Sequence, residues 1–284
     1  MQKIDWLEFV LNMRGAMYQC GQIATRLKSS VARRDKISDL PGVAQRSTTA
    51  VSDVDYLCQE IPFLRLFELT PWIEVYSEEW ASCPAKIQAL FARNQSRYVA
   101  AFDPLDGSDT YLNGNNDYGH MWGVLDSETG KMQCGMIYLP ESHALYFAAR
   151  GQGAFVSHGI FGEIQKIQPV GQVPRTFFNR KRMTPIDCER LERAGFALVP
   201  RHNSCATETV QVAEGKVGAV MMRGYHGHDT APASAIIEEL GGVVLGIDGK
   251  PIVYEKTMAR MPLVIMSLVP EYAESVHRTV IVSE

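Results

Sequence analysis

The spacing of apolar residues in the first part of the chain is that of amphipathic helices. Apolar residues recur every three or four positions over residues 5–34, which predicts one or two helices with Asp5 as the N-cap. Residues 35–49 are polar and contain a Pro-Gly pair, so we expect a mobile loop there, a candidate lid. Helical spacing then returns and places Asp53 or Asp55 at or near a helix start.

Strand patterns follow in the middle of the chain. Residues 72–76 alternate between apolar and polar and lead into the acidic pair Glu78-Glu79. The Gly-x-Gly at Gly151 and Gly153 lacks a following helix, so it predicts a tight strand connection and no dinucleotide site. Further strands are predicted at residues 98–102, 119–125, 134–139 and 144–149, with a hairpin turn over residues 126–131.

The C-terminal half alternates shorter strands and helices. We predict strands at residues 197–199 and 217–222, a helix over residues 207–213 and a loop over residues 224–229. Asp229 then opens a helix that ends at a Gly-Gly pair. A carboxylate at this position caps the helix and lies at the positive end of its dipole.

Composition and charge narrow the class of protein. The chain has 284 residues, 46% hydrophobic and 21% charged, so it can bury a large core as one large domain or two fused ones. The net charge of −4 and the lack of a long basic run argue against a nucleic acid polymer or an anionic membrane as partner. A small-molecule partner is therefore expected.

Cysteine usage and the start of the chain favour the cytoplasm. The 6 cysteines are scattered without a C-x-x-C pair, which argues against a zinc site and for reduced thiols. The sequence shows no apolar run of membrane-spanning length and no basic-then-apolar leader. We therefore expect a soluble, unprocessed cytoplasmic protein.

The predicted buried strand at residues 98–102 ends where the motif Asp-Pro-Leu-Asp-Gly-Ser begins, at residues 103–108. Pro104 pushes Asp103 towards an extended conformation, so Asp103 and Asp106 can bend towards a common point. Two such carboxylates repel each other unless a cation lies between them, and an all-oxygen ligand set suits Mg²⁺ or Mn²⁺. The glycine and serine that follow can form an anion cradle. The alternative is a surface turn, since these are also the commonest turn residues.

The other acids and the two histidines have ordinary structural explanations as well. Asp55 can cap a helix, Glu78 can lie in a solvated turn, and Asp229 can cap the helix that it opens. His226 and His228 could ligate a metal, but without a third neighbour we expect loop or supporting residues. Each acid is thus explained singly, but these explanations do not predict that all five occur together: Asp55, Glu78, Asp103, Asp106 and Asp229.

This set of motifs resembles the inositol monophosphatase family of Mg²⁺-dependent phosphatases. The likeness covers residues 51–242 and rests on the motif at residues 103–108, the preceding Glu78-Glu79 and the Asp-Thr-Ala pattern that runs from Asp229 to a Gly-Gly pair. Residues 103–124 are also similar to the 3′-phosphoadenosine-5′-phosphate phosphatase branch.

The resemblance implies a fold and a cofactor. The fold is layered αβαβα, of mixed α+β and α/β class, with an α+β half at residues 1–150 that carries most metal ligands. An α/β half at residues 151–284 supplies Asp229 and the substrate-reading loop. Family members are commonly homodimers, depend on Mg²⁺ and are sensitive to lithium. Mn²⁺ suits the same oxygen ligands, so we expect it to substitute for Mg²⁺ in this chain.

The resemblance also implies metal ligands. Glu78 and Asp103, with the main-chain carbonyl of Leu105, would bind a first metal ion. Asp106 and Asp229 would hold a second, with Asp103 bridging the two.

Catalytic and phosphate-binding roles follow in the same way. Asp55 matches the acid of the family's Val-Thr-x-x-Asp motif, with Asp53 as the fallback. Glu78, and Ser108 hydrogen-bonded to Asp55, would orient and deprotonate the attacking water. The phosphate would contact Asp106, Gly107 and Ser108.

Three positions depart from the family pattern. His228 replaces an aromatic residue, Met222 replaces the glutamate that reads inositol hydroxyls, and Ser108 replaces a threonine. Met222 cannot accept hydrogen bonds from a polyol, and Arg223 beside it offers a cation. We therefore expect Met222 and Arg223 to line a pocket for a substrate with an extra anionic or flat group.

The sequence thus favours a Mg²⁺-dependent phosphomonoesterase that acts on a small soluble phosphate such as an inositol monophosphate by two-metal activation of water. One alternative is a 3′(2′),5′-bisphosphate nucleotidase of the same family, acting on 3′-phosphoadenosine 5′-phosphate. Another is a non-catalytic relative that binds a phosphorylated ligand.

Overall fold

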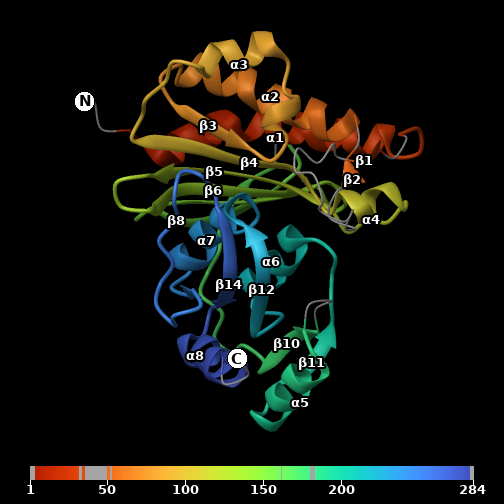
Figure 1. Cartoon of the computed structure of the whole chain (residues 1–284), viewed down its shortest axis with the longest axis vertical. Coiled ribbons are helices and arrows are strands. Elements are labelled where there is room, and N and C mark those ends of the chain that lie inside the picture. Colours follow the sequence, from red (N-terminus) through yellow and green to blue (C-terminus); the bar gives the residue numbers. More distant parts are fainter. Residues whose placement is uncertain are drawn as a thin grey trace, which may run out of the picture.

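The protein folds into alternating layers of helix and sheet (Figure 1). The structure is a computed structural model that describes residues 4–31, 34–35, 50–51, 53–160, 162–179 and 183–281. Within these residues, α1 to α3 cover one face of a seven-stranded sheet, and α6 and α7 lie between this sheet and a five-stranded one. α5 and α8 close the far side (Figure 1). The expected layered αβαβα fold is confirmed.

The first helical layer agrees with the apolar spacing. The stretch predicted as one or two helices over residues 5–34 contains one helix, which ends earlier, at Leu27. The Asp5 carboxylate caps it by accepting from the amides of Leu7 and Glu8. The lid expected at residues 35–49 falls, apart from Asp35, outside the described residues. The elements are α1 (Trp6–Leu27), α2 (Asp53–Leu69), a 3-10 turn at Trp80–Ser82, α3 (Ala85–Phe91), and the paired β1 (Arg34–Asp35) and β2 (Ala50–Val51).

The first sheet has the strand order β3-β4-β5-β6-β7-β8-β9. β3 runs parallel to β4, and the other neighbours are antiparallel. The predicted strands and the tight connection at Gly151 and Gly153 are confirmed. The strands are β3 (Glu74–Ser77), β4 (Tyr98–Asp106), β5 (Gly119–Asp126), β6 (Lys131–Leu139), β7 (Ala144–Ala149), β8 (Gly153–His158) and β9 (Ile164–Lys166), with a 3-10 turn at Pro140–Ser142.

The second sheet has the order β11-β10-β12-β14-β13. Its strands are β10 (Thr176–Asn179), β11 (Ala197–Pro200), β12 (Ala219–His226), β13 (Val243–Leu245) and β14 (Arg260–Ser267). The helices around it are α5 (Pro185–Arg193), α6 (Cys205–Ala213), α7 (Gly227–Glu239) and α8 (Pro270–Ile281). Among the described residues, no helix is both long and apolar enough to span a membrane.

Two expectations about the C-terminal half need correction. The loop expected at residues 224–229 is absent, because β12 pairs with β14 as far as His226 and α7 begins at Gly227. Pairing with a neighbouring strand outweighs the weak strand propensity of Gly and His here. The boundary expected at residue 150 falls between β7 and β8, which pair with each other. The change of sheet comes after β9.

α7 packs unusually close to the first sheet. A Cβ atom at Gly135 on β6 would lie 2.1 Å from the carbonyl oxygen of Pro232 in α7, so glycine permits this approach. The small side chains of Ala231, Ala233 and Ala235 also allow α7 to pack closely. The packing brings Asp229, in the first turn of α7, within electrostatic reach of Asp103 on β4.

Candidate active site

A bulge near the end of β4 positions the two acids of the central motif. In a regular strand, residues three apart point to opposite faces. The register between β4 and β5 shifts between Asp103, opposite Met121, and Asp106, opposite Gly119, so β4 has one extra residue there. The bulge thus allows both acids to face one side. The strand that was predicted to end at residue 102 continues, as β4, to Asp106. Gly107 follows in the left-handed region, with φ of 85°.

Burial raises the pKa of both acids. Asp103 and Asp106 are 2% and 7% exposed. Burial is the main cause of the raised pKa of Asp103, and the charges of Glu78, Asp106 and Asp229 add to it. Burial also raises the pKa of Asp106 to about 7, although hydrogen bonds counteract it. No Lys or Arg side chain of the described residues forms an ion pair with either acid.

The N-terminus of α6 holds Asp106, a contact that sequence analysis missed. Asp106 Oδ2 accepts from the Ser204 hydroxyl at 2.6 Å and from the Ala206 amide at 2.7 Å. Ser204 also caps α6, because its oxygen accepts from the Thr207 amide at 3.1 Å. One carboxylate oxygen of Asp106 is therefore engaged. A serine just before the predicted helix is the signal that points to an N-cap.

Glu78 and Asp229 come from neighbouring elements. Glu78 follows β3, and its amide donates a hydrogen bond to the carbonyl of Phe102 on β4. Its carboxyl lies close enough to Asp103 that, besides burial, it raises the pKa of that acid. One oxygen of Asp229 accepts from the His226 amide at 2.8 Å, so Asp229 also caps α7. The structure therefore brings together the four acids that the sequence grouped as metal ligands.

Asp55 and Ser108 make the contact that was expected of them. The Ser108 Oγ lies 2.9 Å from Asp55 Oδ1 and 2.7 Å from the Leu105 carbonyl oxygen. Asp55 is 1% exposed, whereas Asp53 is exposed at the start of α2. The structure therefore places Asp55, and not the fallback Asp53, beside the central motif.

The acids offer a donor set that fits a hard divalent cation. All the donors are oxygens, and besides burial the charges of Glu78, Asp106 and Asp229 raise the pKa of Asp103, a repulsion that a bound cation would relieve. Within the described residues, no three of these side chains already converge at ligand distances around one point. The metal roles therefore stay predictions for Glu78, Asp103, Leu105, Asp106 and Asp229.

The two histidines lie beside Asp229 in a stack of rings. His228 stacks on Tyr76 and on His226, with ring centroids 5.7 and 5.2 Å apart. Its Nε2 lies 3.3 Å from Asp229 Oδ1. Burial, followed by the neighbouring His228, lowers the pKa of His226. His226 and His228 are therefore placed to hold the Asp229 side chain in position.

The predicted substrate contact of Met222 is wrong. Met222 is fully buried in the core between β12 and the α6–α7 layer, so it cannot touch a substrate. Arg223 points to the other face of β12, where its guanidinium lies 3.2 Å from the carboxylate of Asp187 in α5. This position of Arg223 does not support a role in substrate binding. The strand alternation of β12 thus separates the two residues that were expected to act together.

Comparisons with known proteins identify the family and the fold. The sequence profile of the inositol monophosphatase family matches residues 7–279. The 3′(2′),5′-bisphosphate nucleotidase CysQ of Aggregatibacter actinomycetemcomitans is 23% identical over 75% of this chain and 77% of its own. The inositol-1-monophosphatase of Mesorhizobium japonicum is 27% identical over 70% and 73%. A solved inositol monophosphatase/NADP phosphatase, complexed with Mg²⁺ and phosphate, superposes with a TM-score of 0.69 at 21% identity, over 91% of this chain and 90% of its own.

Proposed function

This chain belongs to the inositol monophosphatase family, and we propose that it is a Mg²⁺-dependent phosphomonoesterase acting on a small soluble phosphate ester. The observation that carries the proposal is the burial of Asp103 and Asp106, which have raised pKa values and no basic partner in the described chain. Such a site is stabilised by a cation and can hold an anion only through that cation.

We assign the metal ligands to the acids around the end of β4. Glu78, Asp103 and the Leu105 carbonyl would hold one ion, and Asp106 and Asp229 a second, with Asp103 shared. When bound, Mg²⁺ supplies the positive charge that binds phosphate, acidifies water and stabilises the leaving oxygen. Mn²⁺ prefers similar oxygen ligands and should substitute for it.

Ser108, Asp55 and Glu78 act on the water in this proposal. The buried Asp55 carboxylate accepts a hydrogen bond from the Ser108 hydroxyl, which leaves a lone pair on the Ser108 oxygen to orient the water. Glu78 takes the proton of that water as general base. The Asp106 carboxyl and the amides of Gly107 and Ser108 face the phosphate.

Inositol monophosphate-like esters are the substrates that we favour. Because Met222 is buried, it can neither read nor reject a polyol, and the earlier reason to expect an extra anionic group falls away. The likeness to CysQ favours one alternative, a 3′(2′),5′-bisphosphate nucleotide. The complete set of acids argues against a non-catalytic relative that only binds a phosphorylated ligand.

We further propose a cytoplasmic homodimer, with neither a nucleic acid polymer nor a membrane as partner. All six cysteines are free, and five of them are buried, which fits a reducing compartment. The homodimer rests on the family resemblance alone.

Phosphate release tests the proposal. The panel is inositol 1-phosphate, 3′-phosphoadenosine 5′-phosphate, fructose 1,6-bisphosphate and p-nitrophenyl phosphate, each with Mg²⁺ and with a chelator. We expect Mg²⁺-dependent release and the highest kcat/KM for inositol 1-phosphate. A higher value for 3′-phosphoadenosine 5′-phosphate would select the nucleotidase alternative, and release from none of the esters would contradict the phosphatase.

A further inference from the structure

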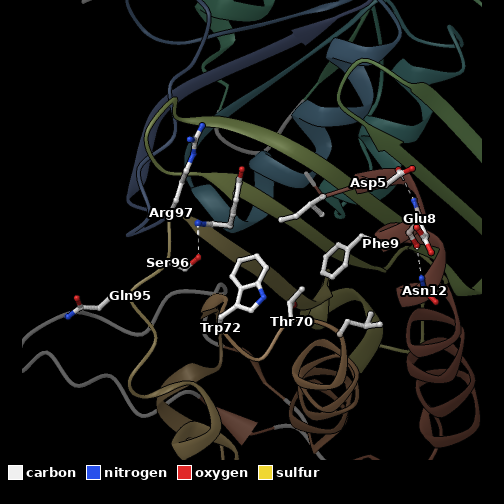
Figure 2. A pocket seen from close by; sticks show the side chains of 12 residues that line it. Asp5, Glu8, Phe9, Asn12, Thr70, Trp72, Gln95, Ser96 and Arg97 are labelled. Atoms are coloured by element: carbon white, nitrogen blue, oxygen red, sulfur yellow. Dashed lines mark hydrogen bonds between the residues drawn. The ribbon is translucent and has the colours of Figure 1, made fainter. Parts of the chain in front are cut away.

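A pocket of about 580 Å³ lies at the start of β4. It is lined by the first turns of α1, the end of α2 and residues 95–98 (Figure 2). The catalytic acids lie at the other end of β4, and at ~3.3 Å per residue the path from Tyr98 to Asp103 spans roughly 17 Å. The pocket is therefore separate from the candidate active site.

Aromatic rings form the apolar wall of this pocket. Trp72 is 43% exposed, and Figure 2 shows its ring between Ser96 and Phe9. The ring of Tyr98 holds Trp72 edge-on, with centroids 6.2 Å apart, so much of the indole remains open to the pocket. A cavity of this size, with an aromatic wall beside polar groups, can hold a small organic molecule.

The polar groups on the α1 side of the pocket include acceptor oxygens. Glu8 lies in the first turn of α1, and its carboxylate has no hydrogen-bond or ion-pair partner within the described part of the chain. Asn12 follows one turn later (Figure 2) and donates its side-chain amide to the Glu8 carbonyl at 2.9 Å. Its side-chain oxygen therefore also stays available to a donor.

The basic residue at the pocket, Arg97, is already neutralised. Its guanidinium makes two hydrogen bonds to Asp126, at 2.7 and 2.6 Å, and an ion pair with Glu128 at 2.8 Å. The Asp5 carboxylate adds a further negative charge to the Glu8 side. The α1 dipole offsets only about half a charge at this end of the helix. An anionic ligand would therefore meet Glu8 with no free cation in the lining to balance it.

From this open indole and these unused acceptors, we propose that the pocket binds an organic cation: a protonated amine joined to an aromatic or other apolar body. The ammonium group donates to Glu8 and Asn12, and the body covers the exposed face of Trp72. This inference does not depend on the phosphatase activity.

Titration calorimetry with 2-phenylethylamine tests the proposal, with phenylacetate as the anion of the same ring. We expect the amine to bind with a Kd of about 1 mM, and phenylacetate at least about tenfold more weakly. Glu8→Gln should weaken amine binding by roughly threefold to tenfold, and Trp72→Ala by about tenfold or more. In nitrogen-correlated NMR spectra, the indole signal of Trp72 should move with the amine.

Two control variants distinguish the loss of Glu8 from the loss of an acid elsewhere in the protein. Glu271 lies in the first turn of α8, as Glu8 does in α1, so Glu271→Gln should bind the amine like the wild type. Asp103→Asn should also bind it normally. The proposal is overturned if phenylacetate binds as tightly as the amine, if Glu8→Gln has no effect, if Asp103→Asn abolishes binding, or if no saturable binding occurs.

Discussion

The two ends of β4 use carboxylates in opposite ways. At the start of the strand, hydrogen bonds from the Arg97 guanidinium lower the pKa of Asp126 on the adjacent β5. At the far end, burial raises the pKa of Asp103 and Asp106, and no basic side chain of the described residues pairs with them. An acid that stabilises the fold thus has its own cation within the chain. We propose that the acids at the far end take one from solution.

The largest difference between the two ends is expected in turnover. Asp103→Asn should lower kcat by about 10³-fold or more, because it removes the ligand that we propose both metal ions share. Asp126→Asn should leave kcat within about twofold and lower the free energy of unfolding by about 1–3 kcal/mol, because Arg97 loses its partner. Phosphate release and urea unfolding measure both effects. An Asp103→Asn protein with normal turnover would break the comparison.

Without metal, the two ends should respond to pH with opposite signs. The pKa of Asp106 is about 7 in the folded protein and near 4 in the unfolded chain, so the unfolded chain loses this proton first. The stability from this group is complete below about pH 4 and is lost as the pH rises to about 7. Asp126 has a lowered pKa, so its contribution is present above about pH 4 and is lost on acidification.

Asp106→Asn isolates the Asp106 part of this pH dependence. In a chelator at pH 8 the melting temperature of the variant should equal or exceed that of the wild type. The free energy of unfolding should be higher by up to a few kcal/mol. At pH 5 this advantage should shrink. Thermal unfolding at both pH values measures it, and equal pH slopes in the two proteins would contradict the raised pKa.

A smaller effect is expected at Ser204, which holds Asp106 from α6. Ser204→Ala should raise the Mg²⁺ concentration for half-maximal activity by roughly threefold to tenfold, since a hydrogen bond to a charged group is lost. Turnover at saturating Mg²⁺ should change less, and Ser204→Thr should restore the Mg²⁺ dependence. The Mg²⁺-induced rise in melting temperature gives a second readout. If Ser204→Ala leaves both unchanged, Ser204 does not position Asp106.

Lithium gives the finest test of the second metal position. Li⁺ should inhibit turnover, uncompetitively or nearly so, by occupying the position between Asp106 and Asp229 after hydrolysis. High Mg²⁺ should inhibit by the same route. Steady-state kinetics at several substrate concentrations measure the pattern. A metal position formed by Asp106 and Asp229 should bind a hard cation such as Li⁺ loosely. Full activity at about 50 mM Li⁺ would therefore count against this second metal position.

The parts of the site that local sequence determines were predictable. The strand before Asp103, the helix that starts near Asp55 and the helix with Asp229 in its first turn all follow from periodicity and capping residues. The hydrogen bond between Ser108 and Asp55 was expected from the family resemblance.

Features that depend on tertiary packing were not predictable. The contact between Ser204 and Asp106 joins residues that are 98 positions apart, and no local pattern indicates it. Met222 was assigned to the substrate by position in the motif, but the alternation of β12 turns it into the core. The pocket at the start of β4 combines α1, α2 and β4, so its lining also appears only in the folded chain.

Titration of Mg²⁺ into the metal-free protein tests the central claim most directly. Calorimetry on the wild type, Asp103→Asn and Asp126→Asn compares the acids at the two ends of β4 under the same conditions. We predict saturable Mg²⁺ binding to the wild type and to Asp126→Asn, with release of protons, and a loss of about tenfold or more in affinity for Asp103→Asn. Equal Mg²⁺ affinity in the wild type and Asp103→Asn would contradict the claim that the acids at the far end of β4 form a cation site.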